Sequence, residues 1–201
     1  MNNVAAPPIL IVPGLRDHVP GHWQTLLEQK LSMAKSVPRM ASASDKLCCA
    51  AWVAELDKSL AAIAGPVVLV AHSAGVMIVA HWAQRHRRPI VGALLAAPPD
   101  FESPLPEGYP TQQVLRDNGW LPTPRAPFPF ATIVAASTND PLGRYERIEA
   151  LATDWGSKLV ALGNVGHLNP ASGYGEWPQA EEFIRELAQA STGPRTRATL
   201  A

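Results

Sequence analysis

The sequence is poor in cysteine and in charged residues, and it has no excess of charge of either sign. Its 201 residues include two cysteines, Cys48 and Cys49, which are adjacent in the chain. Neighbouring cysteines seldom form a structural disulfide, and no cysteine–histidine spacing is typical of zinc, so we expect neither a disulfide framework nor a metal site. Basic and acidic side chains number 17 each. This balance argues against binding to nucleic acid or to an anionic membrane.

Long apolar runs are also missing. The run Val67–Ala71 is among the longest, and a membrane span needs roughly 20 residues. Residues 1–8 lack a charged region followed by a long apolar one, so we expect no secretory signal and, by default, a cytoplasmic protein. Hydrophobic residues make up 47% of the chain, which excludes intrinsic disorder. We therefore expect one domain over residues 1–201, with a core of about 9–190 and a flexible tail at 192–201.

Short apolar runs alternate with longer segments of helical periodicity. This alternation is typical of βαβ units, in which right-handed crossovers place helices on both faces of a parallel sheet. The sequence therefore predicts a three-layer α/β fold with about six mostly parallel strands. The expected strands are Ile9–Val12, Ser36–Met40, Pro66–Ala71, Ile90–Ala97, Phe130–Ala136 and Lys158–Leu162. The expected helices are residues 21–34, 50–64, 75–84, 141–155 and 176–190.

The segment between Ala97 and Phe130 is rich in proline and shows little periodicity. It is too long for a plain connection. Two interpretations stay open, an irregular surface loop and a small lid over a site. Trp23 and Trp177 could line a pocket, although large aromatic side chains are more typical of a core.

The strongest chemical signal is a serine between small residues, placed where a strand gives way to a helix. Ser73 follows the strand ending at Ala71 and precedes Gly75, where a helix is expected to begin. The nucleophile elbow of serine hydrolases needs small residues two positions before and after the serine, because the turn is sharp. Here the first of these is alanine instead of glycine, which adds one methyl group. Ser73 is therefore the candidate nucleophile, and a tight turn with an incidental serine is the alternative.

A serine hydroxyl needs a base, and in this fold the acid and the histidine follow the serine along the chain. Of six histidines, only His167 lies late, directly after the last expected strand. Asp140 follows the fifth expected strand and would orient His167. Asp140 could also simply cap a helix that begins at Pro141. Asp100, after the fourth strand, is the rival acid and ranks lower.

An acyl-transfer site also needs donors for the developing oxyanion. The residue after the nucleophile supplies one N–H, so Ala74 is the first candidate, at the start of a helix whose dipole favours an anion. The second usually comes from the loop after the first core strand. Leu15, which follows Pro13 and Gly14, is our candidate there. The alternative is that Pro13-Gly14 forms only a turn.

Together these segments resemble the small α/β serine hydrolases of the YdeN and retinoblastoma-binding-protein-nine type. The resemblance implies a reduced hydrolase fold without a large cap domain, a Ser73–Asp140–His167 triad and no cofactor. The retinoblastoma-protein-binding motif L-x-C-x-E is incomplete, since residues 47–51 lack its glutamate, so we expect no such partner. The matching segments are Val12-Pro13-Gly14, His22-Trp23-Gln24, Ala71–Gly75, Ala97–Asp100, Ser137–Pro141, Gly166–Asn169 and Ser172–Pro178.

These residues predict a serine hydrolase that cleaves a small ester, thioester or activated amide through an acyl-enzyme on Ser73. One alternative is an acyltransferase that passes the same acyl group to an alcohol or amine. Another is a non-catalytic interaction module on a hydrolase scaffold. The expected partner is a small acyl substrate, with no cofactor, metal, nucleic acid or membrane. Oligomeric state and physiological substrate stay open.

Overall fold

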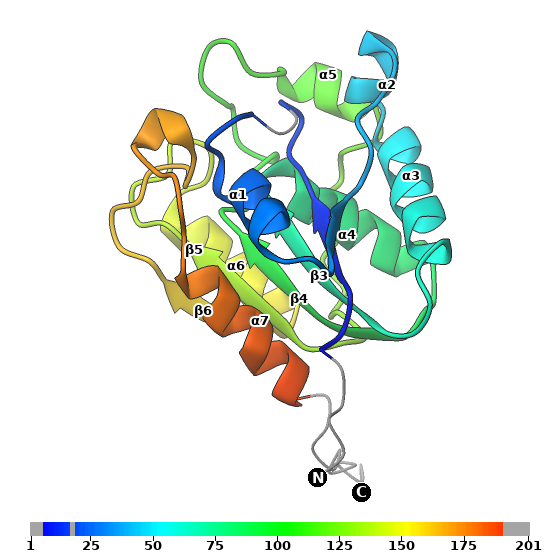
Figure 1. Cartoon of the computed structure of the whole chain (residues 1–201). Coiled ribbons are helices and arrows are strands. Elements are labelled where there is room, and N and C mark those ends of the chain that lie inside the picture. The colour runs from blue at the N-terminus through cyan, green and yellow to red at the C-terminus, as the bar shows by residue number, and fades with distance from the viewer. Residues whose placement is uncertain (1–5, 17–18, 191–201) are drawn as a thin grey trace, which may run out of the picture.

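A computed structural model describes residues 6–16 and 19–190, and the predicted tail at 192–201 lies outside them. Its strands form a single six-stranded sheet (Figure 1) in which every neighbouring pair is parallel. The predicted α/β fold class is confirmed. The strands are β1 (Ile9–Val12), β2 (Ala34–Ser36), β3 (Val67–His72), β4 (Ile90–Ala96), β5 (Thr132–Ala136) and β6 (Lys158–Ala161), in the order β2-β1-β3-β4-β5-β6.

Seven α-helices and one 3₁₀ turn accompany the sheet in the described part of the chain. Among them, α1 and α7 pack together on one face of the sheet (Figure 1), and α3, α4 and α6 cover the other. The helices are α1 (Trp23–Lys30), α2 (Ala43–Leu47), α3 (Cys49–Ala61), α4 (Ala74–Arg85), α5 (Gln112–Asp117), α6 (Tyr145–Asp154) and α7 (Gln179–Ala190), with the 3₁₀ turn η1 at Pro170–Ser172.

Alternating side chains of each strand supply two separate cores. On β3, Leu69 and Ala71 pack with α3 and α4, while Val68 and Val70 pack on the opposite face with α1 and α7. All four are fully buried. A strand buried on both faces has to be apolar throughout, and this is why the central strands are continuous aliphatic runs in the sequence.

The strand order reverses between β1 and β3. From β1 the chain passes outward to β2, and from β3 the later strands extend in the opposite direction. In open parallel sheets, ligands bind outside the carboxyl ends of the strands at such a reversal, because the two loops diverge and leave a crevice. The fold therefore places the loop after β1 beside the loop after β3.

Several predicted elements are displaced, among them the helix expected over residues 21–34, which is Trp23–Lys30. The second strand is Ala34–Ser36, not Ser36–Met40, because Val37 donates the last hydrogen bond to β1 and Pro38 has no N–H to continue the ladder. The helix expected from Pro141 begins at Tyr145, and a turn occupies the interval. The short helix α2 had no counterpart in the prediction.

The proline-rich segment between β4 and β5 contains one six-residue helix, α5, and no cap domain. It is anchored at several points: Phe101 and Trp120 are buried in the core, and the Trp120 indole N–H donates to the carbonyl of Leu47. The segment therefore packs onto the carboxyl edge of the sheet. Within residues 6–16 and 19–190, none of the helices has the length and apolar character needed to cross a bilayer.

Candidate active site

Ser73 occupies a sharp turn between β3 and α4. Its backbone has φ 56° and ψ −131°, a left-handed conformation that is strained for a residue with a side chain. The turn needs Gly75, because a Cβ there would lie 2.3 Å from the carbonyl oxygen of Val12. Gly14 has a similar role on the facing loop, where an added Cβ would lie 3.1 Å from the Cβ of Ser73. The two glycines let the loops after β1 and β3 approach each other closely.

The three residues expected to form a triad meet at the carboxyl edge of the sheet. The Ser73 hydroxyl lies 2.8 Å from Nε2 of His167. Nδ1 of the same ring lies 2.8 Å from a carboxylate oxygen of Asp140. Because an ionised carboxylate only accepts, the ring carries its proton on Nδ1, and Nε2 is left to accept the serine proton. The side chains of His167 and Asp140 are 7% and 3% exposed, so little water competes for this chain of hydrogen bonds.

Several hydrogen bonds fix the loop that carries His167. The backbone N–H of His167 donates to the hydroxyl of Ser172, and the N–H of Gly166 donates to the side-chain carbonyl of Asn139. The carbonyl oxygen of His167 lies 2.9 Å from Nε2 of His72. Both peptide groups of His167 are thus held, which limits movement of the ring away from Ser73.

His72 is a supporting residue that the sequence analysis did not assign. Burial lowers the pKa of His72 well below 6.5, and the neighbouring His167 and His22 lower it further. A neutral His72 can donate from Nε2 to the carbonyl of His167. The His22 ring also contacts His72, with the ring centroids 4.8 Å apart. The only sequence signal for this role was the position of His72 directly before the nucleophile.

The two candidate acids have different partners. One oxygen of Asp140 accepts from His167 and the other accepts from the backbone N–H of Leu142, so orienting the base and capping the following turn use separate atoms. Asp100 instead accepts from Arg147 and Ser103. Burial raises the pKa of Asp100, but these bonds outweigh it and hold the pKa below 3.8. The structure thus brings Asp140, and not Asp100, to the histidine.

The two candidate oxyanion donors both line the cavity into which Ser73 opens. Leu15 lies on the loop after β1, and Ala74 is the first residue of α4. Within the described residues, neither backbone N–H donates a hydrogen bond. An unpaired N–H at a helix start is a favourable site for negative charge.

The cavity has a volume of about 410 Å³. Its walls are largely apolar, with Phe101, Leu105 and Tyr109 from the proline-rich segment on one side and Pro170 and Ala171 from η1 on another. The segment that the sequence left as either loop or lid therefore forms a wall of this cavity. Such a volume suits a small organic substrate.

The chain is similar to known serine hydrolases in sequence and in structure. The family model described as serine hydrolase matches residues 9–186. The chain belongs to this family. The hydrolase is similar to a YdeN-like hydrolase from Pectobacterium atrosepticum, with 28% identity over 92% of this chain and 90% of that one and a TM-score of 0.72. A search of curated proteins finds no match.

Two more distant structures share the fold of the hydrolase. The ydeN product of B. subtilis is 18% identical over 91% of this chain and 99% of that one, with a TM-score of 0.67. Alpha/beta hydrolase domain-containing protein 10 from mouse is 15% identical over 92% and 89% of the two chains, also with a TM-score of 0.67. The expected resemblance to small α/β serine hydrolases of the YdeN type is confirmed.

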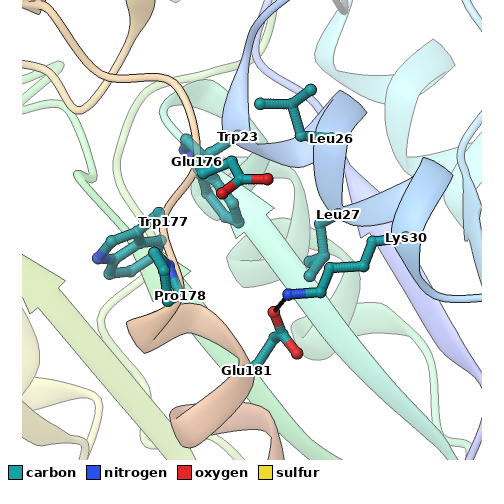
Figure 2. Close-up of a pocket in the computed structure, with 8 residues that line it drawn as sticks. All are labelled: Trp23, Leu26, Leu27, Lys30, Glu176, Trp177, Pro178 and Glu181. Carbon is teal, nitrogen blue, oxygen red and sulfur yellow. Dashed lines mark hydrogen bonds and ion pairs between the residues drawn. The ribbon is translucent and has the colours of Figure 1, made fainter.

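A second hollow in the hydrolase lies between α1 and α7 (Figure 2). Trp23 and Trp177 meet there edge to face with ring centroids 4.9 Å apart, and Lys30 and Glu181 form an ion pair beside them. The hollow measures about 20 Å³, room for about one water molecule. Trp23 belongs to the core, so this hollow is a packing feature. The described part of the hydrolase contains no cluster of three or more side chains able to hold a metal ion.

Proposed function

We propose that this hydrolase is a serine esterase, cleaving a small ester, thioester or activated amide through an acyl-enzyme on Ser73. The observation that carries the proposal is the continuous hydrogen-bonded chain from Asp140 through His167 to Ser73, with both links at 2.8 Å. This order of groups activates a hydroxyl for attack on a carbonyl. Likeness to Est1E from Butyrivibrio proteoclasticus and to a thermophilic esterase from Thermogutta terrifontis also supports ester chemistry.

The first half of the reaction follows from the hydrogen bonds. As Ser73 Oγ attacks the substrate carbonyl, its proton passes to Nε2 of His167. The Asp140 carboxylate stays ionised and stabilises the imidazolium. The N–H groups of Ala74 and Leu15 hold the oxyanion, each worth about 3–4 kcal/mol of barrier. Collapse of the tetrahedral intermediate breaks the bond to the leaving group, which takes the proton from His167.

The second half reverses these roles with water. Water loses a proton to Nε2 of His167 and attacks the acyl-enzyme, forming a second oxyanion in the same position. Collapse releases the carboxylic acid, and the proton returns to Ser73. An alcohol or amine in place of water would give the transferase reaction, so added acceptors and the ratio of products separate these two outcomes.

The test is the change Ser73→Ala. We expect loss of p-nitrophenyl ester turnover and of labelling by a fluorophosphonate probe, with an unchanged circular dichroism spectrum. Ser44→Ala, at an exposed position on α2, is the matched control and should label like the wild type. Undiminished turnover by the Ser73→Ala protein would exclude the mechanism. Absence of both turnover and labelling in the wild type would favour the interaction-module alternative.

A further inference from the structure

One charged side chain lines the substrate cavity without an obvious role in the triad chemistry. Arg16 directly follows Leu15, the candidate oxyanion donor, and both residues border the cavity into which Ser73 opens. The guanidinium carbon of Arg16 lies 4.3 Å from the centre of the Tyr109 ring. Tyr109 belongs to the proline-rich segment, so this contact joins the two sides of the cavity.

The charge of Arg16 is not balanced within the cavity wall. Among the described residues that line it, Arg16 is the one lysine or arginine, and none is an aspartate or glutamate. Arg16 forms no ion pair with any described residue. Two arginines that support the cavity wall differ, since Arg147 on α6 and Arg125 on the proline-rich segment are each paired with acidic side chains. Among the described residues of the wall, an anion that enters the cavity therefore meets one arginine and no carboxylate.

The contact with the Tyr109 ring holds the guanidinium at the cavity wall. Its five N–H donors lie in one plane, and none of them makes a hydrogen bond to a described residue. The tyrosine thus reduces the rotational freedom of Arg16 and leaves its hydrogen-bonding edge available. A planar fork of this kind matches a carboxylate, which it can bind through two parallel hydrogen bonds.

Arg16 lies close enough to Leu15 for the two residues to bind two groups of the same substrate. Consecutive Cα atoms lie about 3.8 Å apart, so the Arg16 side chain begins one residue from the Leu15 N–H. A substrate whose carbonyl oxygen is held by Leu15 and Ala74 would bring a second group, a few carbon atoms away, within reach of Arg16. Apolar surface from Phe101 and Leu105 would contact the carbons between them.

We infer that the hydrolase selects esters that carry a carboxylate group, and that Arg16 is the residue that recognises it. This inference rests on the proposed esterase function and adds a substrate class to it. The carboxylate can stand on the acyl part, as in a half-ester of a dicarboxylic acid, or on the leaving group. The chemistry of recognition is the same, and the experiment separates the two.

The first arm compares mono-p-nitrophenyl adipate with p-nitrophenyl hexanoate, which have the same chain length and leaving group and differ in the terminal carboxylate. The second compares the butyrate esters of 4-hydroxybenzoate and 4-hydroxybenzamide, which differ in charge on the leaving group. Each pair is assayed with wild type, Arg16→Gln and Arg16→Lys. Arg116→Gln removes the same charge at an exposed site on α5 and is the control.

We expect the wild type to prefer the charged ester in at least one arm, and that arm identifies the side of the substrate that Arg16 contacts. Arg16→Gln should lower kcat/KM for that ester by about 10- to 100-fold, the range for a lost charge-assisted hydrogen bond. Its kcat/KM for the neutral ester should change less than about threefold. Arg16→Lys should retain part of the preference, and the preference should shrink with added salt.

Equal losses on charged and neutral esters in the Arg16→Gln protein would overturn the inference, because Arg16 would then act on the loop itself. So would a wild type that shows no preference for charge in either arm. Both results leave the esterase proposal intact as long as p-nitrophenyl hexanoate is hydrolysed in a manner that depends on Ser73. Failure of the wild type to cleave any of the four esters would instead count against the proposed function.

Discussion

Asp140 and Asp100 make a natural comparison, because each follows the end of one of two neighbouring parallel strands. Asp140 comes after β5 and Asp100 after β4, and their side chains are 3% and 5% exposed. Asp140 meets the imidazole of His167, whereas Asp100 meets the guanidinium of Arg147. The same residue type, with similar burial and a similar place in the sheet, thus takes part in different interactions. The partner, and not the position alone, decides what a buried carboxylate can do.

The surroundings of Asp100 explain the difference. Arg147, which binds Asp100, also binds Glu102, and Glu102 binds Arg125, which binds Asp154. This network ties the proline-rich segment to α6 and its C-terminal end. Asp100 is therefore part of the support for the cavity wall, and Asp140 is part of the machinery we propose for the reaction.

The largest expected effect comes from Asp140→Asn. The amide can no longer hold His167 in the required tautomer, so kcat should fall by about 10⁴-fold with little change in folding. Stopped-flow or steady-state hydrolysis of a p-nitrophenyl ester measures this. Asp100→Asn is the matched change on the neighbouring strand and should keep kcat within about threefold. Similar kcat losses in both proteins would abolish the distinction drawn between the two carboxylates.

The second expected effect is on the stability of the fold, and it is larger for a change at Asp100 than for one at Asp140. Asp100→Asn weakens charge-assisted bonds from Arg147 and should lower the free energy of unfolding by about 2 kcal/mol, equivalent to a fall in Tm of about 4–8 °C. Asp140→Asn should lower it less, because the amide oxygen can still accept from the Leu142 N–H while the amide NH₂ donates to Nδ1 of His167, which keeps both contacts but in the wrong histidine tautomer. Thermal and urea unfolding of the two variants provide the measurement. A larger loss of stability for Asp140→Asn would contradict the assignment.

A smaller effect is expected at His72, whose Nε2 lies 2.9 Å from the carbonyl oxygen of His167. His72→Phe removes the donor to the His167 carbonyl and should lower kcat about tenfold, with KM nearly unchanged. His72→Gln can still donate to that oxygen and should recover most of the loss. A change confined to KM, or no recovery by glutamine, would argue against a positioning role.

The smallest effect is a difference in acid sensitivity. Because the pKa of Asp100 is lowered below 3.8 in the folded protein, its ionised form stabilises the fold above that pH. This contribution is lost as pH falls through the folded-state pKa, since the unfolded chain takes up the proton first. The stability gap between wild type and Asp100→Asn should therefore be constant above about pH 5 and narrow below pH 4. Urea unfolding at several pH values tests this. A difference in the free energy of unfolding that grows in acid would contradict a lowered pKa at Asp100.

Much of the fold could be predicted because its central strands are buried on both faces and hence read as unbroken aliphatic runs. The edge strand β2 was misplaced since it pairs only with β1 and its composition carries little signal. The helix expected at Pro141 began later because Asp140 bonds the N–H of Leu142 and makes a turn first. Local composition alone does not decide whether Asp140 caps a helix at once or forms a turn before the helix begins.

The candidate site could be predicted from the sequence because Ser73, Asp140 and His167 each follow a strand. The carboxyl ends of the strands in a parallel sheet meet at one edge. The contact between His72 and the carbonyl of His167 could not be predicted, because it joins residues 95 positions apart. The course of the proline-rich segment was equally hidden. That course depends on long-range contacts, such as the hydrogen bond from Trp120 to Leu47, 73 residues away. It also depends on ion pairs, which produce no periodic pattern in the sequence.

The long separation of Ser73 from His167, 94 residues along the chain, has a consequence for biosynthesis. At about 5–20 residues per second, the ribosome adds the histidine roughly 5–20 seconds after the serine. On the proposed mechanism, the nascent polypeptide lacks the base for the Ser73 hydroxyl throughout that interval. A translation product that ends before His167, which follows the last strand of the sheet, would then be inactive.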